Sequence, residues 1–219
     1  MTTTVNDKIH AWHFLKEGRI MRDGEAAPPV GETLIHSGPI GICESGLHAS
    51  ESVFDAMRYA PGAHLCRVEC EGIEDSHDDK IVCRKRTIIA EADVTTELHI
   101  FAIWCAEQAL DLIEKPDPRS LEALRVKKLW IEGKATDEEL AAARDAARDA
   151  ARDAASAAAR AAARDAASAA ARDAASAAAW AAWAARAARA ARDARAARAA
   201  RAAQARKLEE LIFPKFNIS

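Results

Sequence analysis

Residues 143–204 are built from alanine and arginine, with Asp, Ser, two Trp and one Gln as the only other residue types. They contain neither Gly nor Pro, the residues that most strongly interrupt helices. Alanine has the highest intrinsic helix propensity, and arginine is close behind it. Because no breaker occurs between Ala135 and Phe213, the sequence predicts helix across this whole range.

The spacing of the larger residues within this alanine-rich stretch does not match the helical repeat. A larger residue or serine recurs every fourth position from Arg144 to Trp180, and every third position from Trp180 to Arg201. A helix has about 3.6 residues per turn, so neither row stays on one face. Two arrangements stay open: one long helix with a spiralling polar row, or shorter helices that pack through alanine faces.

Residues 5–95 instead show short apolar runs separated by turn residues. Three runs favour strands because they alternate or are rich in β-branched residues: KIHAWHFL, HLCRVECEG and KIVCRKRTIIAEADV. A helix is predicted for SESVFDAMRYA, capped by Ser50 or Ser52 and ended by Pro61. This pattern is typical of a small α+β domain.

Residues 96–136 predict two amphipathic helices that precede the alanine-rich stretch. The first has an apolar stripe running from Ile100 to Ile113, and the second begins at Pro118, which is favourable in a first helical turn. The expected buried face of the second helix consists of Leu121, Leu124, Leu129 and Trp130. Thr136 followed by Glu139 predicts a capping box at the start of the next helix.

The predicted fold class is therefore α+β with two domains. A small α+β domain covers residues 1–95, and an alanine-rich all-α module, either a long helix or a helical bundle, covers residues 96–219. The apolar segment 208–213 is expected to dock on the helices of residues 99–131. Short loops between the first helices favour antiparallel packing.

Composition indicates the charge distribution of this chain and the cellular compartment that we expect for it. The net charge is −3, yet residues 137–207 carry 14 basic and 9 acidic side chains, so the front of the chain is acidic. No apolar run is long enough to span a membrane, and the first residues do not resemble a signal peptide. Five irregularly spaced cysteines are typical of reduced thiols, and we expect a cytoplasmic protein without a metal site.

The motifs CAEQAL, PDPRSLEAL, GKATDEELAAARDAA and RKLEELI, which span about 120 residues from His99 onward, resemble an alanine-rich immunity protein family of bacteria and their phages. That resemblance implies an all-helical intracellular module without established chemistry. GICESGLHAS and the strand-like runs around it are similar to a small uncharacterised domain common in phage genomes. Together they predict a non-enzymatic protein of phage or prophage origin that binds and neutralises a partner protein in the bacterial cytoplasm.

The expected partner-binding residues lie where the four-residue spacing changes to three. Trp180 and Trp183 are the only aromatic residues of the alanine-rich stretch, and Arg186, Arg189 and Arg192 follow them. Residues 186–207 are basic enough to follow a nucleic-acid backbone. The sequence favours a protein partner, because no aromatic residue follows Trp183 in this segment and its arginines spiral around the helix.

An enzymatic alternative comes from the order of motifs in the N-terminal domain. A strand with His13, a Gly-rich phrase with His48 and a later strand with Glu91 resemble the arrangement in ADP-ribosyltransferases. The resemblance implies that His13 would hold the ribose of NAD, His48 would stack on nicotinamide and Glu91 would polarise a ribose hydroxyl. NAD is expected as a cofactor only under this alternative, in which the helical module would act as a targeting arm. His48 stands where that family usually has Tyr.

Overall fold

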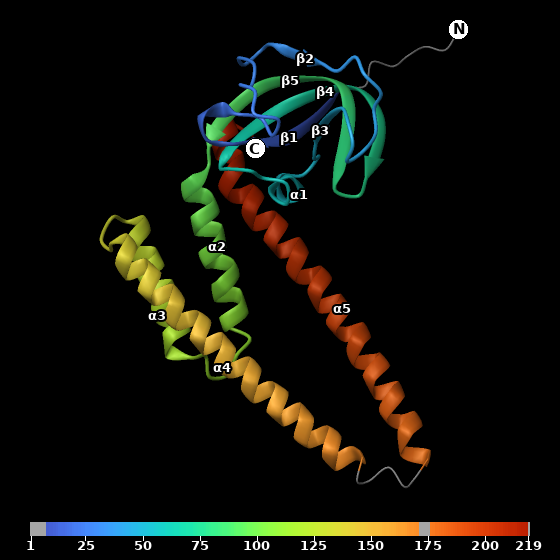
Figure 1. Cartoon of the computed structure of the whole chain (residues 1–219), viewed down its shortest axis with the longest axis vertical. Coiled ribbons are helices and arrows are strands. Elements are labelled where there is room, and N and C mark those ends of the chain that lie inside the picture. Colours follow the sequence, from blue (N-terminus) through green and yellow to red (C-terminus); the bar gives the residue numbers. More distant parts are fainter. Residues whose placement is uncertain (1–7, 171–175, 219) are drawn as a thin grey trace. The chain divides into compact units, whose positions relative to one another are not determined.

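The computed structural model describes residues 8–170 and 176–218, and for residues 158, 159, 161–170 and 176–192 it describes the backbone alone (Figure 1). The chain divides into two units. The sheet unit contains residues 1–101 and 203–219, and the helical unit contains residues 102–202. Antiparallel strands in the front part and helices after them confirm the mixed α and β character.

The sheet unit is organised around two 14-residue strands that form one long hairpin. The sheet order is β1-β4-β5-β2, with β3 also pairing with β5 and all pairs antiparallel. The strands are β1 (Ile9–Leu15), β2 (Thr33–Ile35), β3 (Leu47–Ala49), β4 (His64–His77) and β5 (Lys80–Asp93). The third strand-like run of the sequence is thus a single strand.

The sheet curls back on itself because its first strand also meets the end of β3. Trp12 N–H donates to the Ser50 carbonyl over 2.7 Å, and Ser50 N–H donates to the Trp12 carbonyl over 3.0 Å. Two register shifts between β4 and β5, at Arg67/Val68 and Ile73/Asp75, add the bending that such closure needs. The result is a small barrel-like sheet with an enclosed inner face (Figure 1).

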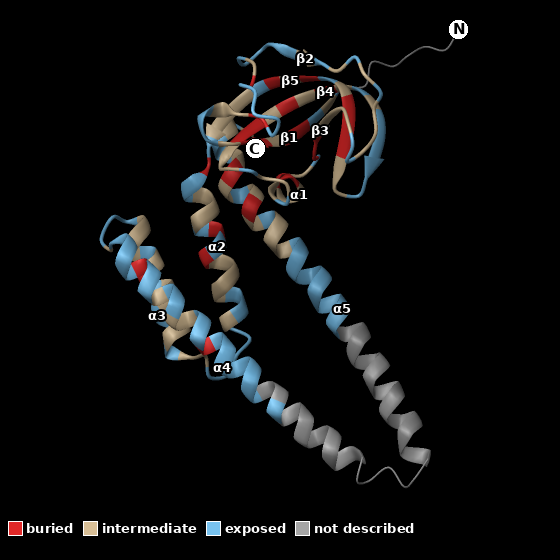
Figure 2. Cartoon of the chain, in the orientation of Figure 1, coloured by how far each residue is buried: buried red, intermediate tan, exposed pale blue. Residues whose placement is uncertain are grey.

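Alternation along β1 separates the two faces of this sheet. Ala11 and Leu15 belong to the buried core of the inner face, together with residues of β3, β4, β5 and the loop after β1. Trp12 and Phe14 point to the outer face and are also buried. Both faces of β1 are therefore covered, which Figure 2 shows as red segments in the middle of the sheet.

The end of the chain covers the outer face of β1. Leu208 and Ile212, near the end of helix α5 (Ser176–Ile212), are fully buried. In the following 3-10 turn η2 (Phe213–Phe216), the ring of Phe213 stacks on Trp12 with centroids 5.8 Å apart, and Phe216 meets Trp12 edge to face. The apolar segment expected to dock on helices 99–131 thus contacts the sheet.

Local capping signals were predicted correctly in three places. Helix α1 (Val53–Met57) begins with Ser52 as its cap, since the Ser52 hydroxyl accepts the Asp55 N–H over 3.1 Å. Helix α3 (Pro118–Ile131) begins at Pro118. Thr136 and Glu139 form the reciprocal capping box of helix α4 (Asp137–Ala170), over 3.2 and 2.8 Å. These caps satisfy backbone donors that a helix start otherwise leaves unpaired.

The expected buried faces of the first two helices were partly wrong. Helix α2 (Thr95–Leu110) buries Phe101 and Ile103, whereas Ile100 and Ile113 of the predicted stripe are exposed. In α3 the buried residue is Val126, while Leu121 is exposed and Leu124, Leu129 and Trp130 are half-buried. Too little of the helical unit surrounds these helices to cover a whole apolar stripe.

Described residues 137–170 and 176–212 are helical, as the alanine-rich composition predicts. Most described side chains of α4 are exposed, with Leu140 and Ala150 as its buried residues (Figure 2). The choice between one continuous helix and shorter ones depends on residues 171–175, which lie outside the described part. Among the described helices, none is both long and apolar enough to cross a lipid bilayer.

Candidate functional site

His13 and Glu91 lie in one row across the sheet, on either side of Cys66. In the β1–β4 ladder His13 pairs with Cys66, and in the β4–β5 ladder Cys66 pairs with Glu91. Directly opposed residues of antiparallel strands point to the same face. All three side chains therefore lie on the inner side of the sheet, where Cys66 is fully buried.

His13 is half-buried on the inner side of the curled sheet. Burial, and next the nearby Arg86 guanidinium, hold the pKa of His13 well below its usual value, so the ring is neutral at physiological pH. The ring also hydrogen-bonds to the backbone of His48. Its inner-face neighbours Ala11 and Leu15 are fully buried. Ribose binding at His13, as the transferase resemblance implies, stays a prediction.

The ring of His48 is held by its own loop. Its Nε2 accepts the Cys43 N–H over 3.0 Å, and its Nδ1 lies 3.2 Å from the Gly46 carbonyl, which fixes the neutral tautomer with the proton on Nδ1. Gly46 has φ +106°, and a Cβ there would come within 2.6 Å of Val82, so only glycine fits. The backbone of His48 thus contacts His13, while the ring of His48 holds the loop before β3 through two hydrogen bonds.

Glu91 has the densest set of polar partners among the three predicted residues. Arg19 Nε lies 2.9 Å from Oε1 and 3.0 Å from Oε2 of the Glu91 carboxylate. His64 Nε2 lies 3.3 Å from Oε2, and Cys66 Sγ lies 4.0 Å from the same oxygen. The Arg19 guanidinium is itself fixed, since its Nη2 donates to the Pro28 carbonyl over 2.6 Å. The carboxylate is therefore held in one orientation.

The buried guanidinium of Arg86 lies near the cysteine thiols of the inner face. Arg86 is almost fully buried, and its Nη1 donates to the His48 carbonyl over 2.6 Å. Its Nε has no hydrogen-bond partner within the described chain. Cys70 and Cys83 hydrogen-bond to each other nearby, which raises the pKa of the Cys70 thiol. Burial raises the pKa of Cys66 to about 12, so this thiol is protonated and unreactive as it stands, whereas the hydrogen bond with Cys70 lowers the pKa of Cys83.

The predicted partner-binding residues lie on α5. The backbone of Trp180, Trp183, Arg186, Arg189 and Arg192 is helical, but their side chains lie outside the described residues. Further along the same basic segment, the side chains at positions 195, 198 and 201 are exposed. The role predicted for the tryptophan pair stays a prediction.

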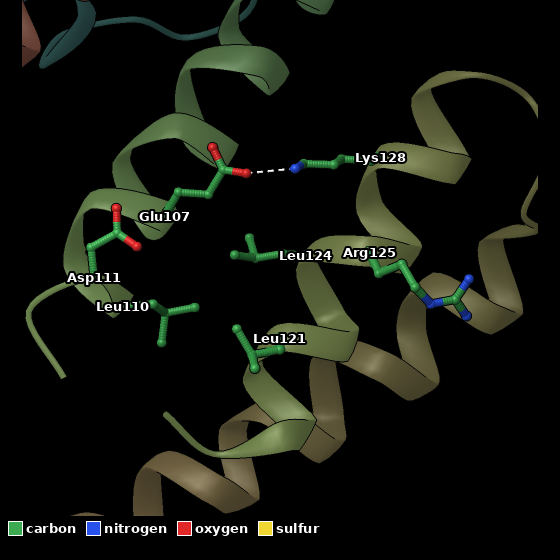
Figure 3. Close-up of a pocket in the computed structure, with 7 residues that line it drawn as sticks. All are labelled: Glu107, Leu110, Asp111, Leu121, Leu124, Arg125 and Lys128. Atoms are coloured by element: carbon green, nitrogen blue, oxygen red, sulfur yellow. Dashed lines mark ion pairs between the residues drawn. The ribbon is translucent and has the colours of Figure 1, made fainter. Parts of the chain in front are cut away.

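The helical unit contains an open groove between α2 and α3. It encloses about 250 Å³, and Figure 3 shows Leu110 of α2 facing Leu121 and Leu124 of α3 across it. In the turn between these helices, Leu112 is 87% exposed and Ile113 is 50% exposed, while Leu121 is 47% exposed. Three large apolar side chains of this hairpin are thus exposed in the described chain, while Leu110 and Leu124 are half-buried.

Charged residues border this groove on both sides. Glu107 comes from α2 and Asp111 directly follows this helix, whereas Arg125 and Lys128 come from α3. Lys128 Nζ pairs with the Glu107 carboxylate over 2.5 Å and bridges the two helices (Figure 3). Arg125 turns away and pairs with Glu122 over 2.6 Å. An apolar strip between an acidic and a basic margin is suited to binding an amphipathic segment.

The fold and these sites define a small curled antiparallel sheet domain followed by helices. Residues 9–100, from β1 into α2, match the model of a domain of unknown function, DUF7666. No curated protein and no solved structure matches the chain. The match agrees with the expected uncharacterised N-terminal domain. It ends before the helical unit, so the likeness of residues 96–219 to immunity proteins stays a prediction.

Two features were missed when the sequence was read alone. His64 and Cys66 are two residues apart on a strand recognised from its alternation, so their shared face was available as a signal. Their proximity to Glu91 was not available, because it depends on the register between β4 and β5. The exposure of Leu121 was also hidden, since a helical repeat shows which residues share a face but not whether that face is covered.

Proposed function

We propose that this protein is a non-enzymatic interaction protein of phage or prophage origin that acts inside the bacterial cell by binding and neutralising a partner protein. The single observation that carries the proposal is the uncovered apolar groove between α2 and α3. Leu121, which is 47% exposed, lines this groove, and Leu112, which is 87% exposed, follows α2 in the turn beside it; a monomeric protein would ordinarily bury such apolar side chains. The phage origin and the neutralising role rest on the sequence resemblances.

The chemistry of the groove indicates what kind of partner segment it takes. Leu110, Leu121 and Leu124 offer a row of apolar contacts of the size that anchors one face of an amphipathic helix. The acidic margin on α2 and the basic margin on α3 would select the direction in which that helix lies. Removing apolar area from water supplies the affinity, at roughly 25 cal/mol per Å² before the cost of association.

The test compares capture of host proteins by the wild type and by a Leu112→Ser/Leu121→Ser variant. Both residues are exposed, so the variant should fold like the wild type. We expect a nuclease-treated bacterial lysate to yield a protein held by the wild type and not by the variant. The dissociation constant measured with that protein, once purified, should rise at least tenfold in the variant.

The matched control is Ile35→Ser, which removes an apolar side chain that is 66% exposed but belongs to β2 of the sheet unit. It should keep wild-type affinity. Equal capture by the wild type and the groove variant would contradict the proposal. Capture that disappears after nuclease treatment would point instead to nucleic acid bound through residues 186–207, and its affinity should then fall steeply with salt.

An NAD-dependent ADP-ribosyltransferase is the second candidate, with the helical module as a targeting arm. The observation that favours it is the position of His13 and Glu91 on one face of the sheet, in line across Cys66. Incubation with labelled NAD and lysate should then transfer label, and His13→Ala should abolish the transfer. If the intact chain does not bind NAD, the result would contradict the transferase and favour the interaction protein.

A further inference from the structure

Three metal-ligating side chains meet on the inner side of the sheet unit. The ligating atoms of His64, Cys66 and Glu91 all lie within 4.8 Å of one another. The two β4 residues are two positions apart and so share a face, and the β4–β5 register brings Glu91 opposite Cys66. This cluster belongs to the sheet unit, whereas the groove belongs to the helical unit, and the proposed interaction function does not use the cluster.

The histidine of this cluster has a buried nitrogen that makes no hydrogen bond within the described chain. His64 Nε2 is shielded from solvent and makes no hydrogen bond with the described chain, although a Glu91 oxygen lies 3.3 Å away. A buried polar atom without a hydrogen bond is costly and calls for an explanation. A bound ion would supply one, because a metal accepts the lone pair that Nε2 presents in the neutral ring.

We infer that His64, Cys66 and Glu91 bind one Zn²⁺ ion, with a water molecule as its fourth ligand. A nitrogen, a sulfur and a carboxylate oxygen are the three donor types that zinc uses in proteins. The Cys66 thiolate and the Glu91 carboxylate carry two negative charges, which balance the ion. On binding, the Zn–S bond replaces the S–H bond of Cys66, and the proton leaves to solvent.

The observed separations are close to those of a tetrahedral site. Zinc–ligand lengths of about 2.0–2.3 Å place N and O ligands roughly 3.4 Å apart, and S and O ligands roughly 3.6 Å apart. His64 Nε2 and Glu91 Oε2 are 3.3 Å apart, which fits directly. Cys66 Sγ and Glu91 Oε2 are 4.0 Å apart, so this pair must close by a few tenths of an ångström, and all three ligating atoms lie within 4.8 Å of one another.

Arg19 supports the carboxylate from the other side. Ligating carboxylates are commonly hydrogen-bonded by a second residue that fixes their orientation. Arg19 Nε takes this position against Glu91, and carbonyl contacts to Pro28 and Ala27 hold its guanidinium in place. Since a carboxylate has about four acceptor positions, the pair with Arg19 leaves room for a metal.

The test uses the full-length chain after removal of metal with a chelator. Titration with Co²⁺ should give visible absorption typical of a tetrahedral site and a near-ultraviolet thiolate-to-cobalt band at one equivalent. Zn²⁺ should displace the cobalt with the same stoichiometry. Glu91→Gln and His64→Gln should each weaken Zn²⁺ binding at least tenfold, and Cys66→Ser should remove the thiolate band.

Cys83→Ser is the matched control, because Cys83 is also a fully buried thiol of the same core but lies outside the cluster. It should keep the cobalt spectrum. Should Cys66→Ser not fold, the Zn²⁺ affinity of Glu91→Gln with an unchanged circular dichroism spectrum decides whether the cluster binds the ion. A wild-type chain that binds no Zn²⁺, or an unchanged thiolate band or affinity in the folded variants, overturns the inference.

Discussion

The clearest electrostatic consequence at the scale of single residues concerns His13. Its pKa is held well below the ordinary value by burial first and by Arg86 second, with His48 and Arg22 acting in the same direction. The folded chain therefore keeps the ring neutral at a pH where the unfolded chain already binds a proton. Protonation of the His13 ring therefore lowers the stability of the folded state.

We predict that the sheet unit loses stability as the pH falls below about 6.5, the ordinary His pKa. Below that value the unfolded state binds more protons than the folded state, so stability rises with pH at up to about 1.4 kcal/mol per pH unit for this group. Urea unfolding at several pH values measures the slope. His13→Asn should make it shallower, with a remainder from His48, whose pKa burial also lowers.

The comparison for this measurement is His10→Asn, which changes a histidine on the same strand whose side chain is largely exposed. It should leave the slope as it is in the wild type. If His13→Asn and the wild type lose stability equally between pH 6.5 and 4.5, the buried ring does not control the acid limit of this fold.

How far single residues could be predicted depended on whether their partners were local. Ser52, Thr136 and Glu139 were identified because a cap and its acceptor lie within three residues of each other. Gly46 could not be identified as obligatory, because the atom that excludes a Cβ belongs to Val82 on another strand. Glu91 was named as a candidate from its motif, yet its partner Arg19 is 72 positions away.

At the scale of elements, α4 illustrates a helix stabilised by its own sequence. Most of its described side chains are exposed, and its packing against α3 buries Leu140 and Ala150. Pairs three residues apart, such as Asp145 with Arg148 at 3.2 Å and Asp149 with Arg152 at 3.0 Å, add a few tenths of a kcal/mol each. Alanine propensity and a good N-terminal cap therefore add to the stability that α4 gains from packing against α3.

We predict that Thr136→Ala destabilises the first turn of α4 by about 1 kcal/mol, since it removes one half of the capping box. Amide hydrogen exchange of residues 138–140 should speed up, while exchange within β4 stays unchanged. Thr136→Ser, which keeps the hydroxyl, should behave like the wild type. Equal protection in all three chains would show that the cap is not limiting.

At the scale of the whole molecule, residues 203–219 belong to the same compact unit as the N-terminal sheet. Leu208 and Ile212 are fully buried, and Phe213 stacks on Trp12 of the first strand. Lys215 adds an ion pair of 3.1 Å with Glu97 and a contact of 3.3 Å with the Asp93 carbonyl. The sheet unit is therefore completed by residues more than a hundred positions away.

We predict that Ile212→Ala destabilises the sheet unit by about 2–5 kcal/mol, because it leaves a cavity where a fully buried side chain packs just before Phe213. Hydrogen exchange of the β1 amides and urea unfolding should both report the loss. The exposed neighbour Lys215→Ala should cost less than about 1 kcal/mol. Unchanged protection of β1 in Ile212→Ala would contradict the assignment of the C-terminal segment to the sheet unit.

The sequence by itself determined those parts of this protein whose causes are local. Alanine propensity, capping pairs, proline positions and strand alternation act within a few residues, so the helices and most strands could be predicted from them. Only the tertiary structure decided which faces are covered, since burial depends on segments distant in the chain. It brought His64, Cys66 and Glu91 together through strand register, left Leu121 exposed, and carried Phe213 to Trp12.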